Sequence, residues 1–231
     1  MIPLHDDNPA GITPYLTVSF IIACVLVFIW QLSFGTEGQQ VVYSFGVIPA
    51  VLLGGQSLPV DLAVIPAWAT VFTSMFMHGG WMHLIGNMLY LWVFGNNVED
   101  AMGHSRFIFF YLLCGTAAVF AQALPDPGSE IPMIGASGAI SGVLGAYLLL
   151  YPHAKVLVAI PVLVIIHTIR IPAAFVLVFW FALQLISSYM SGDEGGGVAF
   201  GAHIGGFIAG MVLVPFFRYK DRPLHLPGMR F

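Results

Sequence analysis

Charged side chains are scarce in this sequence, and their scarcity excludes most classes of soluble protein. Asp, Glu, Lys and Arg together make up 8% of the 231 residues, against roughly 25% in an ordinary soluble domain. Hydrophobic residues account for 58% of the chain, and the mean hydropathy is +0.90. The composition therefore predicts a membrane protein whose chain crosses the bilayer several times.

Disulfides, linkers and a basic surplus are missing as well. Cys24 and Cys114 each lie within an apolar run, where a thiol behaves as a small hydrophobic group, and we expect no disulfide. The net charge of -4 gives no reason to expect a nucleic-acid partner. No Ser-, Pro- or Gln-rich linker divides the chain, so we expect one domain over residues 1–231. Residues 1–15 contain no Lys or Arg, unlike a secretory signal, and we expect the first apolar run to be retained.

Long apolar runs, by contrast, are plentiful. A membrane-spanning helix needs about 20 predominantly apolar residues, and six runs approach that length. They predict an all-α fold, a bundle of six transmembrane helices, with a core over residues 15–217 and a short cytoplasmic tail over 218–231. The segment 156–166 is apolar but has only eleven residues and contains Pro161, so we expect it to be part of a loop. The six runs are residues 15–34, 83–99, 106–124, 137–152, 172–190 and 199–217.

A loop of nearly fifty residues joins the first two predicted helices. It is rich in Val, Leu, Ile and Phe, and Trp68 and Trp81 are of the type that settles at headgroup depth. We therefore expect this loop to lie partly in the membrane interface. Connections of this length are often functional.

All seven Lys and Arg residues follow the second, fourth or sixth predicted helix. Arg106 follows the second, Lys155 and Arg170 follow the fourth, and the other four follow the sixth. The charged residues in the remaining loops are all acidic. Cytoplasmic loops collect Lys and Arg. We therefore expect a multi-pass protein of the plasma membrane, with both termini cytoplasmic and with the second, fourth and sixth helices running from outside to inside.

Four polar side chains lie in the first turns of these inward-running helices. His83 and Asn87 belong to the second helix, Ser137 to the fourth and His203 to the sixth. All four are expected at similar depth near the outer face, and polar groups within membrane segments are functional candidates. Each lies near a helix N-terminus, where free N–H groups and the helix dipole favour developing negative charge.

Glycines recur along the fourth and sixth helices beside Ser137 and His203. Faces of small residues let two helices approach closely, although they are also ordinary membrane packing. Because each glycine face begins with a residue of catalytic type, we expect the two first turns to meet, as a nucleophile and its base require. The glycines are Gly138, Gly142 and Gly145 on the fourth helix and Gly206 and Gly210 on the sixth.

Three motifs follow one another at a distinctive spacing. They are His78-Gly79-Gly80-Trp81-Met82-His83-Leu84-Ile85-Gly86-Asn87-Met88, the Gly-Ala-Ser-Gly run at 135–138, and Ala202-His203-Ile204-Gly205-Gly206 with Gly210 beyond. In order and spacing they resemble the signatures of the rhomboid family of intramembrane serine proteases, and the resemblance covers roughly residues 15–217.

The resemblance implies a role for each site residue. Ser137 would be the nucleophile and His203 its general base. Asn87 and His83 would help the Ser137 backbone N–H to hold the oxyanion, with Gly135 beside the substrate carbonyl. The implied function is an intramembrane serine endopeptidase that cleaves single-span membrane proteins in or near their transmembrane segments.

Some positions depart from the family pattern. Some relatives carry a Trp-Arg pair in the long first loop, where this sequence has Ala69 and Thr70. Some carry an aromatic residue one turn after the serine, which stacks on the histidine, where this sequence has Ser141. We therefore expect His203 to be oriented by another group, such as a hydroxyl or a backbone carbonyl. His78, by the same comparison, would support the loop structure.

We expect a Ser-His dyad, because no Asp or Glu lies inside a predicted span near the outer face. Asp193 and Glu194 precede His203 and remain alternative partners for its imidazole. No cofactor or metal is expected, since the five-residue separation of His78 and His83 does not place two imidazoles on one helix face.

Two other functions stay open at this point. One is a catalytically silent relative that binds transmembrane clients, which would be expected to lack the serine or the histidine. The other is a small membrane transporter, in which intramembrane histidines carry protons. The lipid bilayer is a partner in every case, and the oligomeric state is left open.

Overall fold

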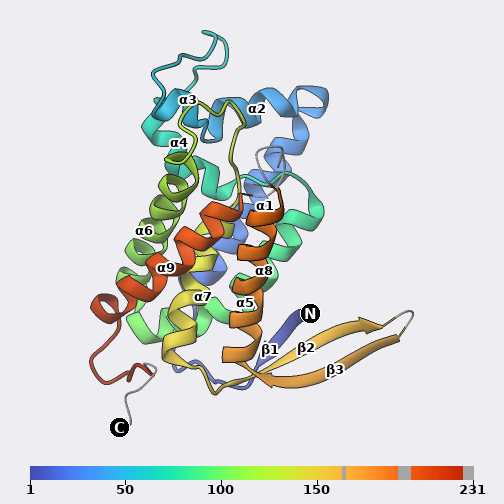
Figure 1. Cartoon of the computed structure of the whole chain (residues 1–231), viewed down its shortest axis with the longest axis vertical. Coiled ribbons are helices and arrows are strands. Elements are labelled where there is room, and N and C mark those ends of the chain that lie inside the picture. The colour runs from blue at the N-terminus through green and yellow to red at the C-terminus, as the bar shows by residue number, and fades with distance from the viewer. Residues whose placement is uncertain (163–164, 192–198, 226–231) are drawn as a thin grey trace.

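The computed structural model describes residues 1–162, 165–191 and 199–225, and in it a bundle of long helices stands on a small sheet (Figure 1). Each long helix begins and ends within three residues of a predicted run. The extent of the helices is therefore confirmed. The long helices are α1 (Tyr15–Ser33), α5 (Trp81–Met102), α6 (His104–Ala123), α7 (Ser137–Leu150), α8 (Ala173–Ser191) and α9 (Phe200–Phe217).

Four helices in the described part of the chain are long and apolar enough to cross a membrane, namely α1, α6, α8 and α9. Helix α7 is apolar but has only 14 residues. The chain is therefore an integral, multi-pass membrane protein that is predominantly helical.

The long loop after α1 contains short helices of its own. They lie at the end of the bundle opposite the sheet (Figure 1), so this connection is an ordered cap on the bundle. The short elements are η1 (Gly35–Glu37), α2 (Gly38–Phe45), α3 (Pro49–Leu52), α4 (Ala67–Thr73) and η2 (Ser74–Phe76).

A three-stranded antiparallel sheet corrects the predicted all-α class. Its order is β1 (Ile2–Asp6), β2 (Lys155–Val162) and β3 (Ile165–Pro172), with Ile2 opposite Ala159 in β2. The prediction that 156–166 is part of a loop is wrong, because most of that segment lies in the β2–β3 hairpin. β-branched residues at alternate positions, such as Val156, Val158 and Ile160, suit a pleated strand.

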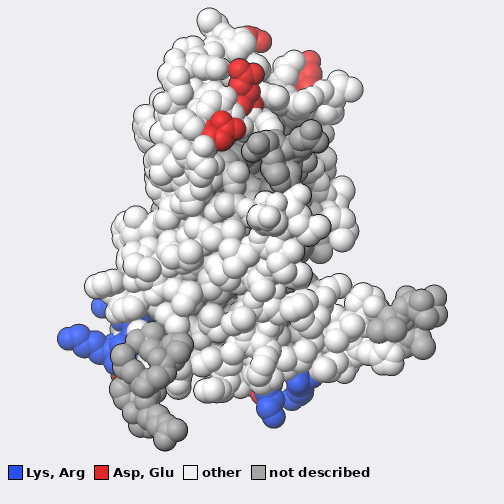
Figure 2. Space-filling model, in the orientation of Figure 1, with Lys and Arg blue, Asp and Glu red and all other residues white. Residues whose placement is uncertain are grey.

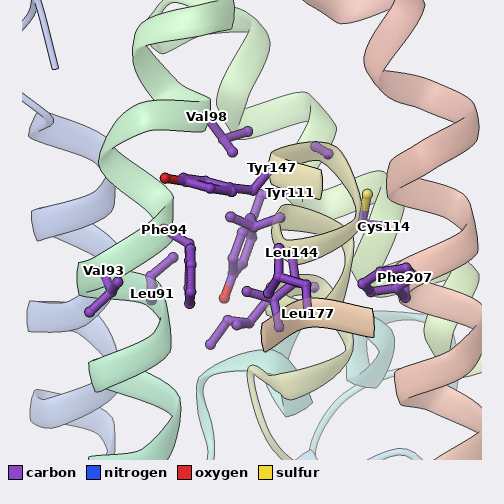
Figure 3. Close-up of a cluster of buried hydrophobic side chains, with 14 of the residues drawn as sticks. Leu91, Val93, Phe94, Val98, Tyr111, Cys114, Leu144, Tyr147, Leu177 and Phe207 are labelled. Carbon is purple, nitrogen blue, oxygen red and sulfur yellow. The ribbon is translucent and has the colours of Figure 1, made fainter. Parts of the chain in front are cut away.

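Helix α7 lies at the centre of the bundle, packed against α5, α6 and α9. Its Leu144 and Tyr147 are almost completely buried, and Tyr147 meets Phe94 of α5 edge to face at 4.9 Å between ring centroids (Figure 3). Tyr111 of α6 fills the same region and is fully buried. Because α7 is buried at the centre of the bundle, the helices around it fix the position of its first residue, Ser137.

The predicted glycine faces of α7 and α9 meet. A Cβ on Gly206 would overlap the carbonyl oxygen of Gly138, and one on Gly210 would overlap that of Gly142. A Cβ on Gly145 would likewise overlap the carbonyl of Phe207. Because the backbones touch directly, the first turns of the two helices are held side by side.

A buried carboxylate ties the start of α1 to the end of α5. Glu99 is 0% exposed and accepts hydrogen bonds from the backbone N–H groups of Leu16 and Thr17 at 2.9 and 2.8 Å. The Thr17 hydroxyl donates to it at 2.7 Å, and His104 Nδ1 lies 2.6 Å from its other oxygen. Glu99 therefore supplies an N-terminal cap to a helix from outside that helix.

Charge is segregated along the bundle. Figure 2 shows Lys and Arg at the end that carries the sheet and most of the visible acidic side chains at the opposite end, and Asp7, beside Lys155, and Asp221 are exposed at the basic end. Arg222 at the basic end pairs with the buried Asp100 at 2.9 Å. Among the predicted tail residues, Arg230 lies outside the described part of the chain.

Candidate active site

One cavity of about 950 Å³ opens at the end of the bundle opposite the sheet. Its walls come from the loop before α5, from α5, from the loop before α7, and from α7, α8 and α9. Four of the five predicted site residues line it, and the fifth, Gly135, lies two residues before Ser137 in the chain. The four are His83, Asn87, Ser137 and His203.

Ser137 is the first residue of α7, and its side chain reaches the cavity. The first backbone hydrogen bond at this end runs from Ile140 N–H to the Ala136 carbonyl, at 2.9 Å. The N–H groups of residues 137 to 139 therefore have no acceptor within the helix. A serine hydroxyl and free backbone donors lie together at the positive end of the helix dipole.

His203 lies in the first turn of α9, and a side-chain amide holds its ring. Its Nδ1 lies 2.8 Å from Gln184 Oε1, on α8. Gln184 Nε2 donates to the Trp180 carbonyl at 3.4 Å, which turns the amide oxygen toward the imidazole. Because that oxygen only accepts, Nδ1 of His203 carries the proton and Nε2 is left as the basic nitrogen.

Aromatic rings flank the same imidazole. The Trp180 ring centroid lies 5.9 Å from that of His203, with the two planes at 37°, and Phe200 lies edge-on at 6.4 Å. The Ser141 hydroxyl donates to the Ser137 carbonyl at 2.6 Å. The expected orienting group, a hydroxyl or a backbone carbonyl, is therefore replaced by the Gln184 amide.

His83 and Ser137 come together around Gly135. A Cβ on Gly135 would lie 2.9 Å from His83 Nε2 and 3.6 Å from Ser137 Oγ, so both groups face the space that glycine leaves empty. Gly135 has a φ of +130°, a conformation that other residues rarely adopt. His83 Nδ1 accepts a hydrogen bond from Gly79 N–H at 3.2 Å, so a neutral ring presents Nε2–H beside Ser137.

Asn87 lies one turn further along α5. Its side chain is 8% exposed, and its Nδ2 donates to the His83 carbonyl at 2.8 Å. A primary amide has two N–H groups, so one donor remains for a ligand in the cavity.

His78 anchors the loop that precedes α5. Its backbone N–H donates to Gln31 Oε1 at 3.0 Å, and Gln31 Nε2 donates to its carbonyl at 3.2 Å. The side chain is 1% exposed, and Nε2 has no hydrogen-bond partner among the described residues. Burial and the neighbouring His83 lower the pKa of His78 to about 4. These contacts are those of a residue that supports the loop.

Two alternatives from the sequence concerned an acidic partner for His203 and a metal ion. Asp193 and Glu194, the alternative partners of His203, lie outside the described residues. Within the described ranges, no group of three or more His, Cys, Asp or Glu side chains could hold a metal ion.

Comparison with known proteins identifies the family. The family model of the rhomboid domain matches residues 66–220, a stretch that includes all five predicted site residues. The chain belongs to the rhomboid family. This rhomboid carries a serine, two histidines and an asparagine at the positions that the sequence motifs indicated.

Curated relatives of this rhomboid come from bacteria, yeast and plants. The chain is 32% identical to Rhomboid protease GluP of Bacillus subtilis over 136 residues, which are 58% of this chain and 24% of that protein. It is 38% identical to the mitochondrial Rhomboid protein 1 of Saccharomyces cerevisiae over 92 residues, which are 38% of this chain and 27% of that protein. It is 29% identical to the chloroplastic Rhomboid-like protein 11 of Arabidopsis thaliana over 157 residues, which are 64% of this chain and 52% of that protein. The matches thus span between a quarter and half of these relatives.

Proposed function

We propose that this rhomboid is an intramembrane serine endopeptidase. It hydrolyses peptide bonds in or near the transmembrane segments of membrane proteins. The observation that carries the proposal is the single cavity that contains the Ser137 hydroxyl, the His203 imidazole and the donors beside them. A serine hydroxyl and an imidazole of fixed tautomer in one cavity are the groups that acyl transfer requires.

The reaction begins when Ser137 Oγ attacks the carbonyl carbon of the scissile peptide bond. His203 Nε2 takes the hydroxyl proton and returns it to the leaving amine, so the C–N bond breaks and an acyl-enzyme forms. Water then attacks the ester, again with His203 as base, and releases the new carboxyl end. Gln184 keeps Nδ1 protonated throughout, because its amide oxygen cannot donate.

The tetrahedral oxyanion lies where free donors converge. These are the Ser137 backbone N–H, His83 Nε2–H and the second N–H of the Asn87 amide. Gly135 leaves the room in which the substrate carbonyl and the His83 ring face each other. Removal of one such donor typically costs about 10²–10³ in turnover, so Asn87→Ala lowers the rate while Ser137→Ala abolishes it.

The proposed topology has six spans, with α5 and α7 crossing alongside the other four long helices. Helix α7 has 14 residues and is about 21 Å long at 1.5 Å per residue, whereas the hydrocarbon core is about 30 Å thick. Ser137 therefore lies below the membrane surface, and the cavity above it supplies water for hydrolysis.

We infer that the basic end of the bundle is cytoplasmic. Both described chain ends, the strand β1 and the segment after α9, then lie on the cytoplasmic side, and the cavity opens to the outer side of a plasma membrane. The partners are single-span membrane proteins. Because a helix hides its peptide bonds, such a substrate unwinds locally, which favours helix-destabilising residues near the cut.

The deciding experiment is cleavage of a labelled transmembrane substrate by the purified chain in lipid vesicles, beside Ser137→Ala. We expect fragments from the wild type only, and labelling of Ser137 by a fluorophosphonate probe. Identical fragments from both proteins, or none from either across varied substrates, would rule out the protease. Substrate binding without cleavage would point to a silent client-binding protein, and proton-coupled solute uptake into vesicles would point to a transporter.

A further inference from the structure

The β2–β3 hairpin projects sideways from the base of the bundle (Figure 1). β3 ends at Pro172, and the membrane-spanning helix α8 begins at Ala173 without a linker. The base of the hairpin is therefore fixed at the membrane boundary, on the end of the molecule that carries the Lys and Arg residues. The part of the hairpin away from this base extends sideways beyond the helices (Figure 1).

One face of this hairpin, here called the inner face, is apolar. Side chains alternate between the two faces of a strand, and directly opposed residues share a face. Val156 and Val158 of β2 are both 0% exposed and fix the side that packs on the bundle. Ile160 continues this face toward the tip, and Ile169, opposite Val158, is 43% exposed on it. The inner face thus starts under the bundle and continues past its edge with uncovered isoleucine.

The outer face carries polar and basic groups. Lys155, Thr168 and Arg170 all lie on it and are exposed. Near the tip the pattern is less strict, since His167 is the polar member of the inner face and Ile166 an exposed apolar member of the outer face. Leu157, Ala159 and Pro161 of β2 are apolar members of the same outer face. The polar and basic side chains of the outer face are therefore interspersed with apolar ones, and its charge lies near the base.

The backbone limits how deep the hairpin can lie. β3 is an edge strand, so the N–H and C=O groups along its free edge need partners. Such edges do not occur in the hydrocarbon region, where an unpaired backbone group costs several kcal/mol, but headgroups and interfacial water can pair with them. The depth that suits both the exposed Ile169 and the free edge is the headgroup boundary.

We propose that the hairpin is a membrane-surface anchor that binds anionic phospholipid in the leaflet at the basic end of the bundle. Its inner face rests on the acyl boundary through Ile160 and Ile169, and Lys155 and Arg170 attract the phosphates of neighbouring headgroups. Arg106 and Lys220 are also exposed, and Figure 2 shows a second, separate group of basic side chains at the same end of the molecule. Positive charge at the headgroup level selects an anionic lipid over a zwitterionic one.

The test uses an environment-sensitive fluorophore on the two faces of β3. Ile169→Cys places the probe on the inner face, and Thr168→Cys, one residue away, places it on the outer face as the matched control. The two native cysteines, Cys24 and Cys114, are buried. Each labelled protein is reconstituted in vesicles of phosphatidylcholine with or without phosphatidylglycerol, and quenching is measured with spin-labelled lipids and with aqueous iodide.

We expect the probe at 169 to be quenched by lipid and the probe at 168 by iodide. Spin-labelled phosphatidylglycerol quenches the inner probe more than spin-labelled phosphatidylcholine does. The double variant Lys155→Gln, Arg170→Gln removes that preference. Each lost charge lowers the affinity for phosphatidylglycerol relative to phosphatidylcholine by about fivefold. These variants change only exposed side chains, and helical content by circular dichroism checks that the bundle is intact.

Two results would overturn the proposal. Equal quenching of both probes by iodide would mean that the hairpin extends into water. Shielding of the inner probe from both quenchers, with energy transfer between separately labelled copies, would assign the face to a second copy of this chain. Neither result depends on protease activity, so the anchor and the proposed function are tested separately.

Discussion

Gln184 decides, through one hydrogen bond, which nitrogen of His203 is basic. We predict that Gln184→Leu lowers kcat for a transmembrane substrate by about 10–100-fold with little change in KM. A positioned general base contributes about 10²–10⁴-fold to the rate, and the variant loses part of that contribution because His203 is no longer held in position. Gln184→Glu keeps an acceptor oxygen for Nδ1–H and retains more activity than Gln184→Leu. Equal losses in the two variants, or a change in KM alone, would make Gln184 a packing residue.

Gly135 is where the site is most sensitive to a single methyl group. We predict that Gly135→Ala destabilises the chain by about 1–3 kcal/mol, because its φ of +130° disfavours a side chain. It also abolishes most of the activity, because the new Cβ would displace the His83 ring from beside Ser137. Thermal unfolding and substrate cleavage measure the two effects. A fully active Gly135→Ala protein would remove His83 from the proposed oxyanion site.

The sequence indicated Ser137, His203, His83 and Asn87 because each is a polar residue at the start of an apolar helix. Gln184 gave a weaker signal, a lone amide late in α8, far from any motif. Its role depends on how α8 is rotated and placed against α9, which no residue pattern within either helix specifies. Only the packed bundle brings Oε1 of Gln184 to Nδ1 of His203.

At the scale of elements, the α7–α9 contact has no room for a side chain. We predict that Gly210→Ala lowers the free energy of unfolding by about 1–3 kcal/mol, as overpacking of a filled core does, because its Cβ would overlap the Gly142 backbone. Gly86→Ala is the matched control, since a Cβ there meets nothing within 4 Å. That control should be neutral or slightly stabilising by helix propensity. Equal unfolding temperatures for the two variants would contradict the close α7–α9 contact.

The α1–α5 connection depends on the Glu99 carboxylate. We predict that Glu99→Ala destabilises the protein by about 3–5 kcal/mol, because it leaves the buried Thr17 N–H and the partly buried Leu16 N–H without an acceptor. Thr17→Val removes only the hydroxyl bond and costs about 1 kcal/mol. Unfolding in detergent measures both. The interpretation fails if the two variants are equally stable.

Element boundaries were predictable wherever one physical rule dominated. The six long helices could be located from the length and apolarity of their runs in the sequence, because an apolar segment in lipid pairs its backbone groups by forming a helix. The β2–β3 hairpin was missed because only the length of its apolar run was weighed. Alternating β-branched residues between Lys155 and Pro172 carried the signal for strands. The partner strand β1 could not be found locally, since it lies at the other end of the sequence.

At the scale of the whole molecule, stability should depend on the protonation of His78. Its pKa is lowered from 6.5 to about 4 by burial and by His83, so as the pH falls below 6.5 the unfolded chain binds this proton before the folded one does. We predict a loss of about 3 kcal/mol between pH 6.5 and pH 4, at 1.36 kcal/mol per pKa unit. Denaturant unfolding in detergent at several pH values measures it. A His78→Gln protein with the same pH dependence would assign the effect to another group.

The pairing of β1 with β2 sets an order of assembly. Ile2 lies opposite Ala159, so β1 cannot find its partner until the ribosome has added more than 150 residues, which takes roughly 8–30 s at about 5–20 residues per second. By then α1, α5, α6 and α7 have all been synthesised. β1 therefore waits unpaired until β2 has been synthesised, and a reporter placed on Ile2 would register the closing of the sheet after the synthesis of those four helices.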